Sequence, residues 1–274
     1  MLAIPISLRR RRWYHRQFGR YLRSSRAVTF TDKVNWRILH DRRALLQGTC
    51  DKLWMKDHAL RTAPGLVRVP QTYWSGTDIT ELATLDLPER WVLKPNHSTR
   101  LVVLGEGRPD VEELGRRTKG WLEEDLATRT GEWAYGHARP LLLVEEFIGE
   151  PGQTPLDYKV YVFDGVPRLV QVHSSRFGEH TSRVYTPDWE PRHWSGGHPF
   201  GPDVPRPQRA AEMFEAAAEL AKDFDMLRVD FYEHDGVLWF GELTPYPGSG
   251  LVQLDPAMDE ELGRWWHLPG RKAA

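Results

Sequence analysis

Arg228, Asp230 and Glu242 lie in a short segment near the C-terminus, RVDFYEHDGVLWFGELTPYPGSG (residues 228–250). Two apolar runs flank the turn-forming sequence HDG, so the segment is expected to form a β-hairpin. If residues 234–236 form a three-residue loop, Arg228, Asp230 and Glu242 line one face of the sheet, because residues directly opposite each other share a face. A two-residue loop would instead put Asp230 and Glu242 on opposite faces.

Two carboxylates on one sheet face repel each other unless a cation lies between them. Arg228 could supply that charge in a structural salt bridge, which is the simpler interpretation of the hairpin alone. A Mg²⁺ ion is the second interpretation, because Mg²⁺ binds one or two carboxylates together with phosphate oxygens. Thr244 continues the same face if the strand extends that far.

A magnesium site that binds phosphates also needs cationic side chains, and four candidates occur elsewhere in the chain. Each of them, taken alone, is typical of a solvated surface. Together with the carboxylate pair, they favour a site for a magnesium-bound phosphate group. The four are Lys52 in CDKLWMK, Lys94 in VLKPNH, Lys159 in DYKVYVF, and Arg176 at the end of the strand that pairs with the Lys159 strand.

The elements that must position these side chains mix helices with antiparallel hairpins, which predicts an α+β fold. Six prolines mark residues 187–207 as a long loop. Trp189 and Trp194 in this loop could cover an acceptor site or simply pack the loop on itself, and the spacing of His193 and His198 is not diagnostic of a metal. The expected elements are helices in 30–60, two strands in 91–104, one helix over 111–128, a strand over 139–148, a hairpin around Asp-Gly over 157–177 and a helix over 207–224.

The charge of the chain is unevenly distributed. Residues 1–26 hold eight arginines and no acid, so the remaining residues hold 37 − 8 = 29 basic and 38 acidic side chains. Trp13, Phe18, Tyr21 and Leu22 recur at roughly helical spacing, which predicts an amphipathic helix that packs its aromatic face on the body of the protein. The arginines could still attract an anionic membrane surface, whereas nucleic acid is not expected as a partner.

A single cysteine, Cys50, excludes an internal disulfide, and no apolar run approaches the ~18–20 residues of a membrane span. The N-terminal residues also lack the order of charged and apolar residues found in a secretory signal. We therefore expect a cytoplasmic protein, with peripheral attachment to a membrane as an open alternative. The sequence does not predict an oligomeric state.

The order of the motifs resembles the ATP-grasp superfamily, and in particular its TupA-like members, over nearly the whole chain. The resemblance implies two α+β lobes that bind ATP and Mg²⁺ between them. The expected divisions are a helical segment over 1–65, a first lobe over 66–143 and a second lobe over 144–274. The motifs are FTDKVNWRILHDRR, CDK, WVLKPNH, GEWAYG, LVEEFI, DYKVYVFDG, RVDFY and FGELTPYPGSG.

The resemblance also implies roles for individual residues on the nucleotide side. Lys52 and Lys94 match the lysines that contact phosphates. The loop after Lys94, usually glycine-rich in the family, reads His-Ser-Thr-Arg here, so Ser98 and Thr99 would donate through their hydroxyl groups, together with Arg100. The adenine base would be bound by the side chain of Glu145 or Glu146 and by backbone groups of Phe147 and Ile148.

On the reaction side, the resemblance implies that Asp230 and Glu242 bind magnesium. Thr244 stands where many members have Asn as a third ligand, and a hydroxyl is a weaker ligand. The cations expected to hold the γ-phosphate or an acceptor carboxylate are Arg228, Lys159 and Arg176.

The function implied by the resemblance is an ATP-dependent ligase that joins a carboxylate to an amine through an acyl phosphate. The substrates would be an amino acid, uronic acid, amino sugar or peptide, in the synthesis of a cell-surface polymer or natural product. Two alternatives stay open. One is a kinase that phosphorylates a hydroxyl group, and the other is a non-catalytic scaffold that binds an anionic surface through its basic arm.

Overall fold

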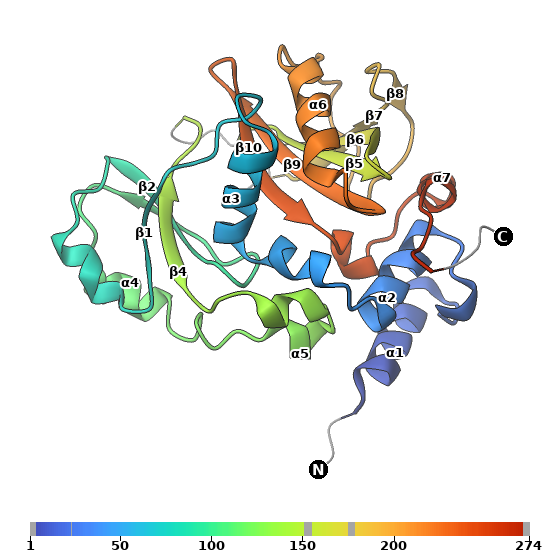
Figure 1. Ribbon diagram of the computed structural model, residues 1–274, viewed down its shortest axis with the longest axis horizontal. Coiled ribbons are helices and arrows are strands. Elements are labelled where there is room, and N and C mark those ends of the chain that lie inside the picture. The colour runs from blue at the N-terminus through green and yellow to red at the C-terminus, as the bar shows by residue number, and fades with distance from the viewer. Residues whose placement is uncertain (1–3, 23, 151–154, 175–178, 271–274) are drawn as a thin grey trace.

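The computed structural model describes residues 4–22, 24–150, 155–174 and 179–270. It contains two antiparallel β-sheets, with helices packed around them (Figure 1). The predicted α+β class is therefore confirmed. No helix in these ranges is long and apolar enough to cross a membrane.

The large sheet has six strands in the order β10-β9-β5-β6-β7-β8. Of the hairpin predicted over 157–177, residues 157–174 form β5 and β6, and residues 175–177 lie outside the described residues. Both residues of its turn, Asp164 and Gly165, have positive φ. This conformation is typical of a tight hairpin turn. The strands are β5 Asp157–Phe163, β6 Val166–Ser174, β7 Thr181–Tyr185, β8 Pro191–Arg192, β9 Met226–His234 and β10 Val237–Thr244.

The two faces of the large sheet differ sharply in polarity. Strand β9 shows this best, because buried Leu227, Val229 and Phe231 alternate with Arg228 and Asp230. The apolar face packs on α6 (Ala210–Ala221), the helix predicted over 207–224. The polar face is therefore left to carry a site.

The small sheet has four strands in the order β1-β4-β2-β3 and an apolar cluster of its own around Trp91 and Leu93. The single helix predicted over 111–128 is wrong. Helix α4 (Val111–Arg117) ends before Gly120, whose φ is +84°, and α5 (Leu126–Thr130) starts anew after the capping residue Asp125. The strands are β1 Thr72–Gly76, β2 Arg90–Pro95, β3 Val103–Glu106 and β4 Leu142–Glu146, with the 3₁₀ helix η3 Ile79–Thr84 alongside.

The N-terminal helices do not form a separate unit. Residues of α2 (Phe30–His40) and α3 (Lys52–Thr62) share one apolar core with the large sheet and with α7 (Pro256–Trp265). The chain leaves the small sheet after Glu146, whereas the expected division at residue 143 falls inside β4. The remaining elements are α1 Ile6–Phe18 and the 3₁₀ helices η1 Ser24–Arg26, η2 Ala44–Cys50, η4 Trp133–His137 and η5 Pro247–Gly250.

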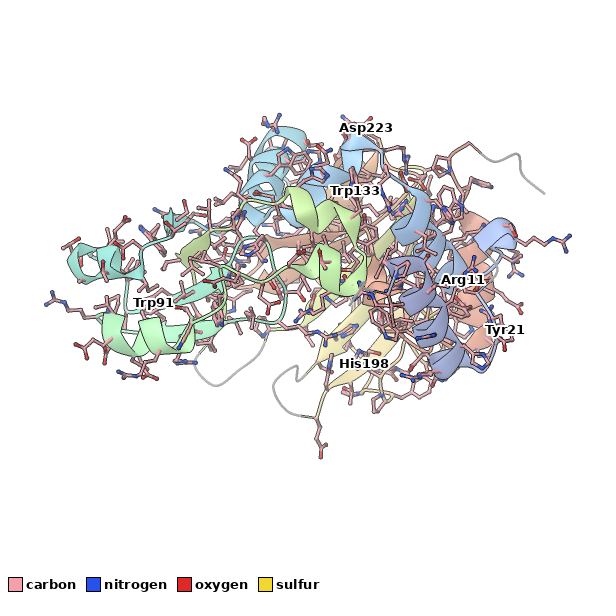
Figure 2. The ribbon with its side chains drawn as sticks, turned by 90° about the horizontal axis from the view of Figure 1, so that it is seen from below. Arg11, Tyr21, Trp91, Trp133, His198 and Asp223 are labelled. Carbon is pink, nitrogen blue, oxygen red and sulfur yellow. The ribbon has the colours of Figure 1, made fainter. Side chains whose placement is uncertain are left out.

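The basic arm forms α1, but its contact with the body differs from the expected aromatic face. The fully buried side chains are Tyr14 and Arg10, whereas Tyr21 is 74 % exposed. The guanidinium of Arg10 donates to Asn35 Oδ1 at 3.2 Å and to Ser249 Oγ at 3.1 Å. Arg11 and Tyr21 lie toward the end of the molecule opposite Trp91 of the small sheet (Figure 2).

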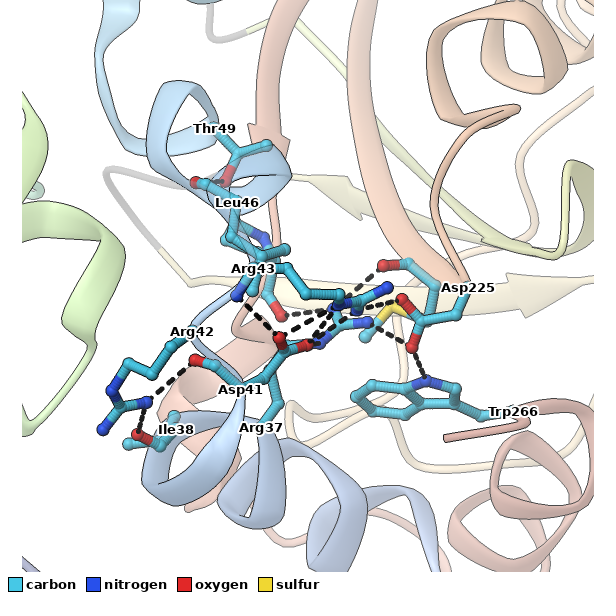
Figure 3. Close-up of polar contacts among 11 residues, drawn as sticks. Arg37, Ile38, Asp41, Arg42, Arg43, Leu46, Thr49, Asp225 and Trp266 are labelled. Atoms are coloured by element: carbon cyan, nitrogen blue, oxygen red, sulfur yellow. Dashed lines mark hydrogen bonds and ion pairs between the residues drawn. The ribbon is translucent and has the colours of Figure 1, made fainter. Parts of the chain in front are cut away.

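A second buried arginine joins α2 to the large sheet in a cluster that we call the α2 ionic cluster: Arg37, Asp41, Arg43, Asp225 and Trp266 (Figure 3). Arg37 Nη2 lies 2.8 Å from Asp225 Oδ2, and Trp266 Nε1 donates to the same carboxylate at 2.6 Å. Arg37 Nη1 also donates to the carbonyl oxygens of Met226 and Pro245. These contacts fasten the start of β9 and the segment after β10, so the FTDKVNWRILHDRR motif holds the scaffold of the site.

Candidate nucleotide and metal site

The register of the β9–β10 hairpin decides which side chains share a face. The loop has two residues, Asp235 and Gly236, and not the three on which the predicted alignment depended. A bulge between Phe240 and Glu242 corrects the alignment, so Glu242 pairs directly with Asp230. A Cβ atom at the bulge residue, Gly241, would lie 2.8 Å from the Asp230 carbonyl oxygen, so the close approach of the two backbones favours glycine.

The bulge completes a group of side chains that we call the sheet-face cluster: Lys159, Arg228, Asp230, Glu242 and Thr244. Arg228 Nε donates to Asp230 Oδ1 at 2.6 Å. Arg228 Nη2 donates to Thr244 Oγ1 at 3.0 Å and to Glu242 Oε1 at 3.3 Å. Lys159 forms a further ion pair with Asp230. All five predicted residues therefore come together, and Arg228 is the salt-bridge partner expected from the hairpin alone.

Charge governs the protonation of this cluster. Burial alone would raise the pKa of Asp230, but the charges of Arg228 and Lys159 outweigh it and hold that pKa well below its usual range. Asp230 is therefore an anion at any physiological pH. Asp157 is a third carboxylate that the sequence reading missed: it is fully buried, and its Oδ2 lies 2.7 Å from Lys159 Nζ. The alternation of Asp157 and Lys159 along one strand was the available signal.

The donor set of the cluster fits a hard divalent cation. Two carboxylates face each other on neighbouring strands, and the Thr244 hydroxyl donates to Glu242 at 3.2 Å. The side chain of Glu242 is 44 % exposed, whereas that of Asp230 is 2 % exposed. Oxygen ligands of this kind suit Mg²⁺, and the exposed Glu242 leaves the cluster open to solvent and to a phosphate-bearing ligand.

Lys52 begins α3, and the chain before it explains how it is held. The Asp51 carboxylate caps the helix by accepting from Trp54 N at 2.9 Å. Lys52 Nζ donates to the carbonyl oxygens of Pro95 (2.8 Å) and Ser98 at the end of the small sheet. Burial and the charge of Lys94 lower the pKa of Lys52 to about 8, against the opposing charges of Glu242 and Glu145. Lys52 thus lies within electrostatic reach of both sheets.

Lys94 does not stand alone, because Glu145 lies between two lysines. Glu145 forms ion pairs with Lys94 and, at 2.7 Å, with Lys56. Burial would raise the pKa of Glu145, but Lys94 and Lys56 outweigh it and lower that pKa. The carboxylate expected to bind adenine is thus engaged with lysines in this structure. Lys56 was missed by the sequence reading; its position four residues after Lys52 on one helix face was the available signal.

Glu146 lies where the two sheets are joined. Its carboxylate accepts from Arg68 Nη2 and from Gln71 N, each at 3.0 Å. The Arg68 backbone bonds in turn to β10, through Leu238 O and Phe240 N at 2.8 Å each. The half-buried Phe147 and Ile148 follow directly, so the expected adenine-binding backbone lies beside the connection between the sheets.

The loop after Lys94 contains a buried hydroxyl group without a hydrogen-bond partner in the described part of the chain. Ser98 is buried, and its Oγ has no hydrogen-bond partner among the described residues. Its neighbour Thr99 is exposed, and Arg100 has a φ of +66°, which is unusual for a residue with a side chain. An orphaned hydroxyl beside Lys52 fits a phosphate oxygen as its missing partner.

Two other expectations concern the neighbouring loops. Arg176 lies outside the described residues. In the proline-rich loop, Trp189 stacks on Tyr185 with ring centroids 4.7 Å apart and donates to Val204 O at 2.9 Å. Trp189 thus joins the loop both to β7 and to its own residue Val204.

The family model described as TupA-like ATPgrasp matches residues 32–266, most of the chain. The chain belongs to the TupA-like ATP-grasp family. No curated protein matches the sequence.

The solved structures that resemble this ATP-grasp protein are distant. D-alanine-D-alanine ligase from Helicobacter pylori has a TM-score of 0.46 and 16 % identity, over 82 % of this chain and 60 % of the ligase. The Bacillus anthracis D-alanine-D-alanine ligase complexed with ATP has a TM-score of 0.46 and 18 % identity, over 81 % of this chain and 64 % of the ligase. D-cycloserine synthetase DcsG has a TM-score of 0.45 and 17 % identity, over 92 % of this chain and 79 % of the synthetase. The chain thus spans less than two thirds of the length of either D-alanine-D-alanine ligase.

Proposed function

We propose that this protein is an ATP-dependent ligase that joins a carboxylate to an amine, with Mg²⁺ bound at the sheet-face cluster. The observation that carries the proposal is the position of Lys52: its Nζ donates to Pro95 O at the end of β2, and its helix, α3, contacts β10 of the large sheet, where Leu243 N donates to Met55 Sδ. The cations proposed to bind phosphates therefore lie near the carboxylates proposed to bind the metal. Membership of the ATP-grasp family supports ATP as the ligand.

Each group has a task that its chemistry allows. Asp230, Glu242 and the weaker ligand Thr244 would hold Mg²⁺, which supplies charge neutralisation for the phosphates. Lys52, Lys94 and the Ser98 hydroxyl would hold the phosphate chain, with Thr99 at the rim. Residues 145–148 would bind the adenine base. Because the Glu145 carboxylate is paired with lysines, the proposal assigns most of the hydrogen bonds to adenine to backbone groups of this segment.

The proposed reaction has two steps. A carboxylate oxygen of the acceptor attacks the γ-phosphorus of ATP and releases ADP, which forms an acyl phosphate. An amine then attacks the acyl carbon, so that phosphate leaves and a proton is released. Arg228 and Lys159 are placed to hold the transferring phosphate or the acceptor carboxylate, and Arg176 is assigned the same task. The protein therefore contributes positioning and charge rather than covalent catalysis.

The substrates are proposed as a class: an amino acid, uronic acid or peptide as the acid, with an amino acid, amino sugar or peptide as the amine. The test is turnover of ATP with Mg²⁺ against pooled acids and amines, with ADP and free phosphate followed separately and Glu242→Ala as the control. ADP and phosphate released together, only when both an acid and an amine are present, support the ligase. ADP without free phosphate indicates a kinase. No turnover and no magnesium-dependent binding of ATP would refute catalysis and leave the scaffold alternative.

We also propose that the exposed arginines of α1 bind an anionic membrane surface. Helix α1 exposes three arginines, Arg11, Arg12 and Arg16, together with the neighbouring Leu8. Arg10 is instead buried and donates to Ser249 in the body of the protein. Binding to vesicles with and without phosphatidylserine tests this proposal. Loss of binding in the triple variant Arg11→Gln, Arg12→Gln, Arg16→Gln supports it, and equal binding to neutral vesicles contradicts it.

A further inference from the structure

Three histidines from separate segments converge beside the large sheet. His173 lies near the end of β6, His180 directly precedes β7, and His198 belongs to the proline-rich loop. Ligand nitrogens of the three imidazoles all lie within 4.8 Å of one another. The ring centroids of His180 and His198 are 4.0 Å apart, and each of these rings is 4.9 Å from His173. In the view of Figure 2, His198 lies between Trp91 and Tyr21 along the molecule.

The backbone around the cluster holds these rings in place. His173 pairs with Ser182 across β6 and β7, which puts His180 at the adjoining strand end. The loop is fastened on both sides of His198: Gln171 Nε2 donates to Gly196 O at 2.9 Å, and Ser182 N donates to Pro199 O at 3.0 Å. The convergence therefore follows from sheet pairing and loop anchoring, and not from an accidental contact of mobile side chains.

The distances suit a tetrahedral metal site. Zn²⁺ binds imidazole nitrogen at about 2.0–2.1 Å, which places neighbouring ligand nitrogens about 3.4 Å apart. The observed His173 Nδ1 to His180 Nε2 distance is 2.7 Å, and the whole group lies within 4.8 Å. The required spacing falls between these values, so small rotations of the rings would form the site.

His173 is buried, and the strand next to it carries a buried carboxylate. Asp157 lies directly opposite His173 on β5. A carboxylate beside a metal-binding imidazole is a common arrangement, because it orients the ring and offsets the charge of the ion.

We propose that His173, His180 and His198 bind a Zn²⁺ ion that fastens the proline-rich loop to the large sheet. Three protein ligands leave a fourth coordination position open. His198 also lines a groove of about 540 Å³, together with Ser195, Phe200, Leu251 and Gln17 of α1. This groove gives water or a small anionic ligand a path to the ion at His198. The site shares none of its three ligands with the sheet-face cluster and does not rest on the proposed ligase activity.

The test measures metal binding and needs no substrate. Untagged full-length protein is stripped of metal, titrated with Zn²⁺ against a chromogenic chelator, and then loaded with Co²⁺ to record the visible absorption of a four-coordinate ion. We expect one Zn²⁺ per chain, binding weakened by about 100-fold or more in His198→Ala and in His180→Ala, and the four-coordinate Co²⁺ spectrum lost in both.

Two controls separate this site from the rest of the chain. His193→Ala removes an exposed histidine of the same loop, and Glu242→Gln alters the proposed magnesium site. Both should bind Zn²⁺ as the unsubstituted protein does, and circular dichroism of the metal-free variants confirms that each is folded. The proposal is overturned if the unsubstituted protein binds less than one Zn²⁺ tightly, or if folded His198→Ala and His180→Ala both keep that affinity.

Discussion

The α2 ionic cluster and the sheet-face cluster are built from the same residue types but are closed to different degrees. Arg37 and Asp225 are 0 % and 9 % exposed at their side chains, and the two terminal nitrogens of Arg37 donate to a carboxylate and to two backbone carbonyls (Figure 3). In the sheet-face cluster, Arg228 and Asp230 are similarly buried, but Glu242 is 44 % exposed. One cluster holds both of its carboxylates in buried contacts, and the other keeps one carboxylate available.

The difference shows that a charged motif is not functional merely because it is buried and ionic. Ion pairs in the interior offset their desolvation only when most of their hydrogen bonds are made. In the α2 ionic cluster Asp225 accepts from Arg37, Arg43 and Trp266, and of the cluster's buried side-chain nitrogen and oxygen atoms only Nε of the Arg37 guanidinium has no hydrogen-bond partner among the described residues. The sheet-face cluster leaves part of its charge in solvent, where a cation or phosphate can reach it. Substitutions in the two clusters should therefore have opposite effects on stability and on activity.

The largest expected effect is on catalysis. Glu242→Gln removes the charge of the accessible carboxylate with little change of shape, and we expect ATP turnover to fall by about 10³-fold. The melting temperature should hardly change, because this side chain is 44 % exposed. Asp235→Asn, at an 81 % exposed position in the turn of the same hairpin, is the matched control and should keep full activity. Equal losses in both variants would contradict a specific role for Glu242.

The next effect is on stability. Arg37→Met leaves Asp225 buried without its main partner, and we expect the free energy of unfolding to fall by about 3–5 kcal/mol. Turnover per folded molecule should remain unchanged. Urea denaturation measures the loss, and Arg61→Met, in a pair with both side chains 63 % exposed, serves as the control with a change below about 1 kcal/mol. A folded Arg37→Met protein that has lost activity would contradict the division of roles.

A smaller effect should come from the bulge. Gly241→Ala puts a Cβ atom 2.8 Å from the Asp230 carbonyl oxygen, so the strand must shift and Glu242 must move relative to Asp230. Displacements near 1 Å can reduce rates by about 10²-fold, and we expect a loss of that order in kcat/KM. Gly236→Ala strains the turn at a φ of +68° without touching the cluster, and should cost stability but not activity. The reverse outcome would mean that the bulge does not align the site.

The smallest effect concerns pH. The pKa of Lys52 in the folded protein is about 8, below the ordinary 10.5, because of burial and Lys94. Lys52 is therefore charged below pH 8 and neutral above it, and affinity for a non-hydrolysable ATP analogue should fall by up to about tenfold per pH unit above pH 8. The effect on folding has the opposite sign. Because the folded state disfavours the charged form of Lys52, this residue lowers the free energy of unfolding by its full amount below pH 8, and the loss disappears as the pH rises from 8 to 10.5.

Lys52→Arg provides the control for the pH experiment, because arginine stays charged over the whole range. The variant should bind the analogue with no decline between pH 7 and 9.5. A decline of the same slope in the variant would show that another group titrates there.

The sequence predicted most of the sheet-face cluster, because hairpin alternation and the motif order place those residues without any knowledge of packing. It could not predict the alignment correctly, since a two-residue turn and a bulge at Gly241 offset each other and neither can be read from an alternating pattern. Asp157 pairs with Lys159 on its own strand, so its alternation with Lys159 was available in the sequence. Lys56 was missed because its partner, Glu145, comes from a distant strand. The burial of Arg10 was missed for the same reason: a helix pattern predicts apolar contact, whereas Asn35 and Ser249 provide polar partners.

The central claim is that the sheet-face cluster binds magnesium and ATP, whereas the α2 ionic cluster supports the fold. Calorimetric titration of an ATP analogue into the unsubstituted protein, Glu242→Gln and Arg37→Met, with and without Mg²⁺, tests it most directly. We predict magnesium-dependent binding to the unsubstituted protein and to folded Arg37→Met, and loss of the magnesium dependence in Glu242→Gln. Unchanged magnesium-dependent binding in Glu242→Gln would contradict the claim.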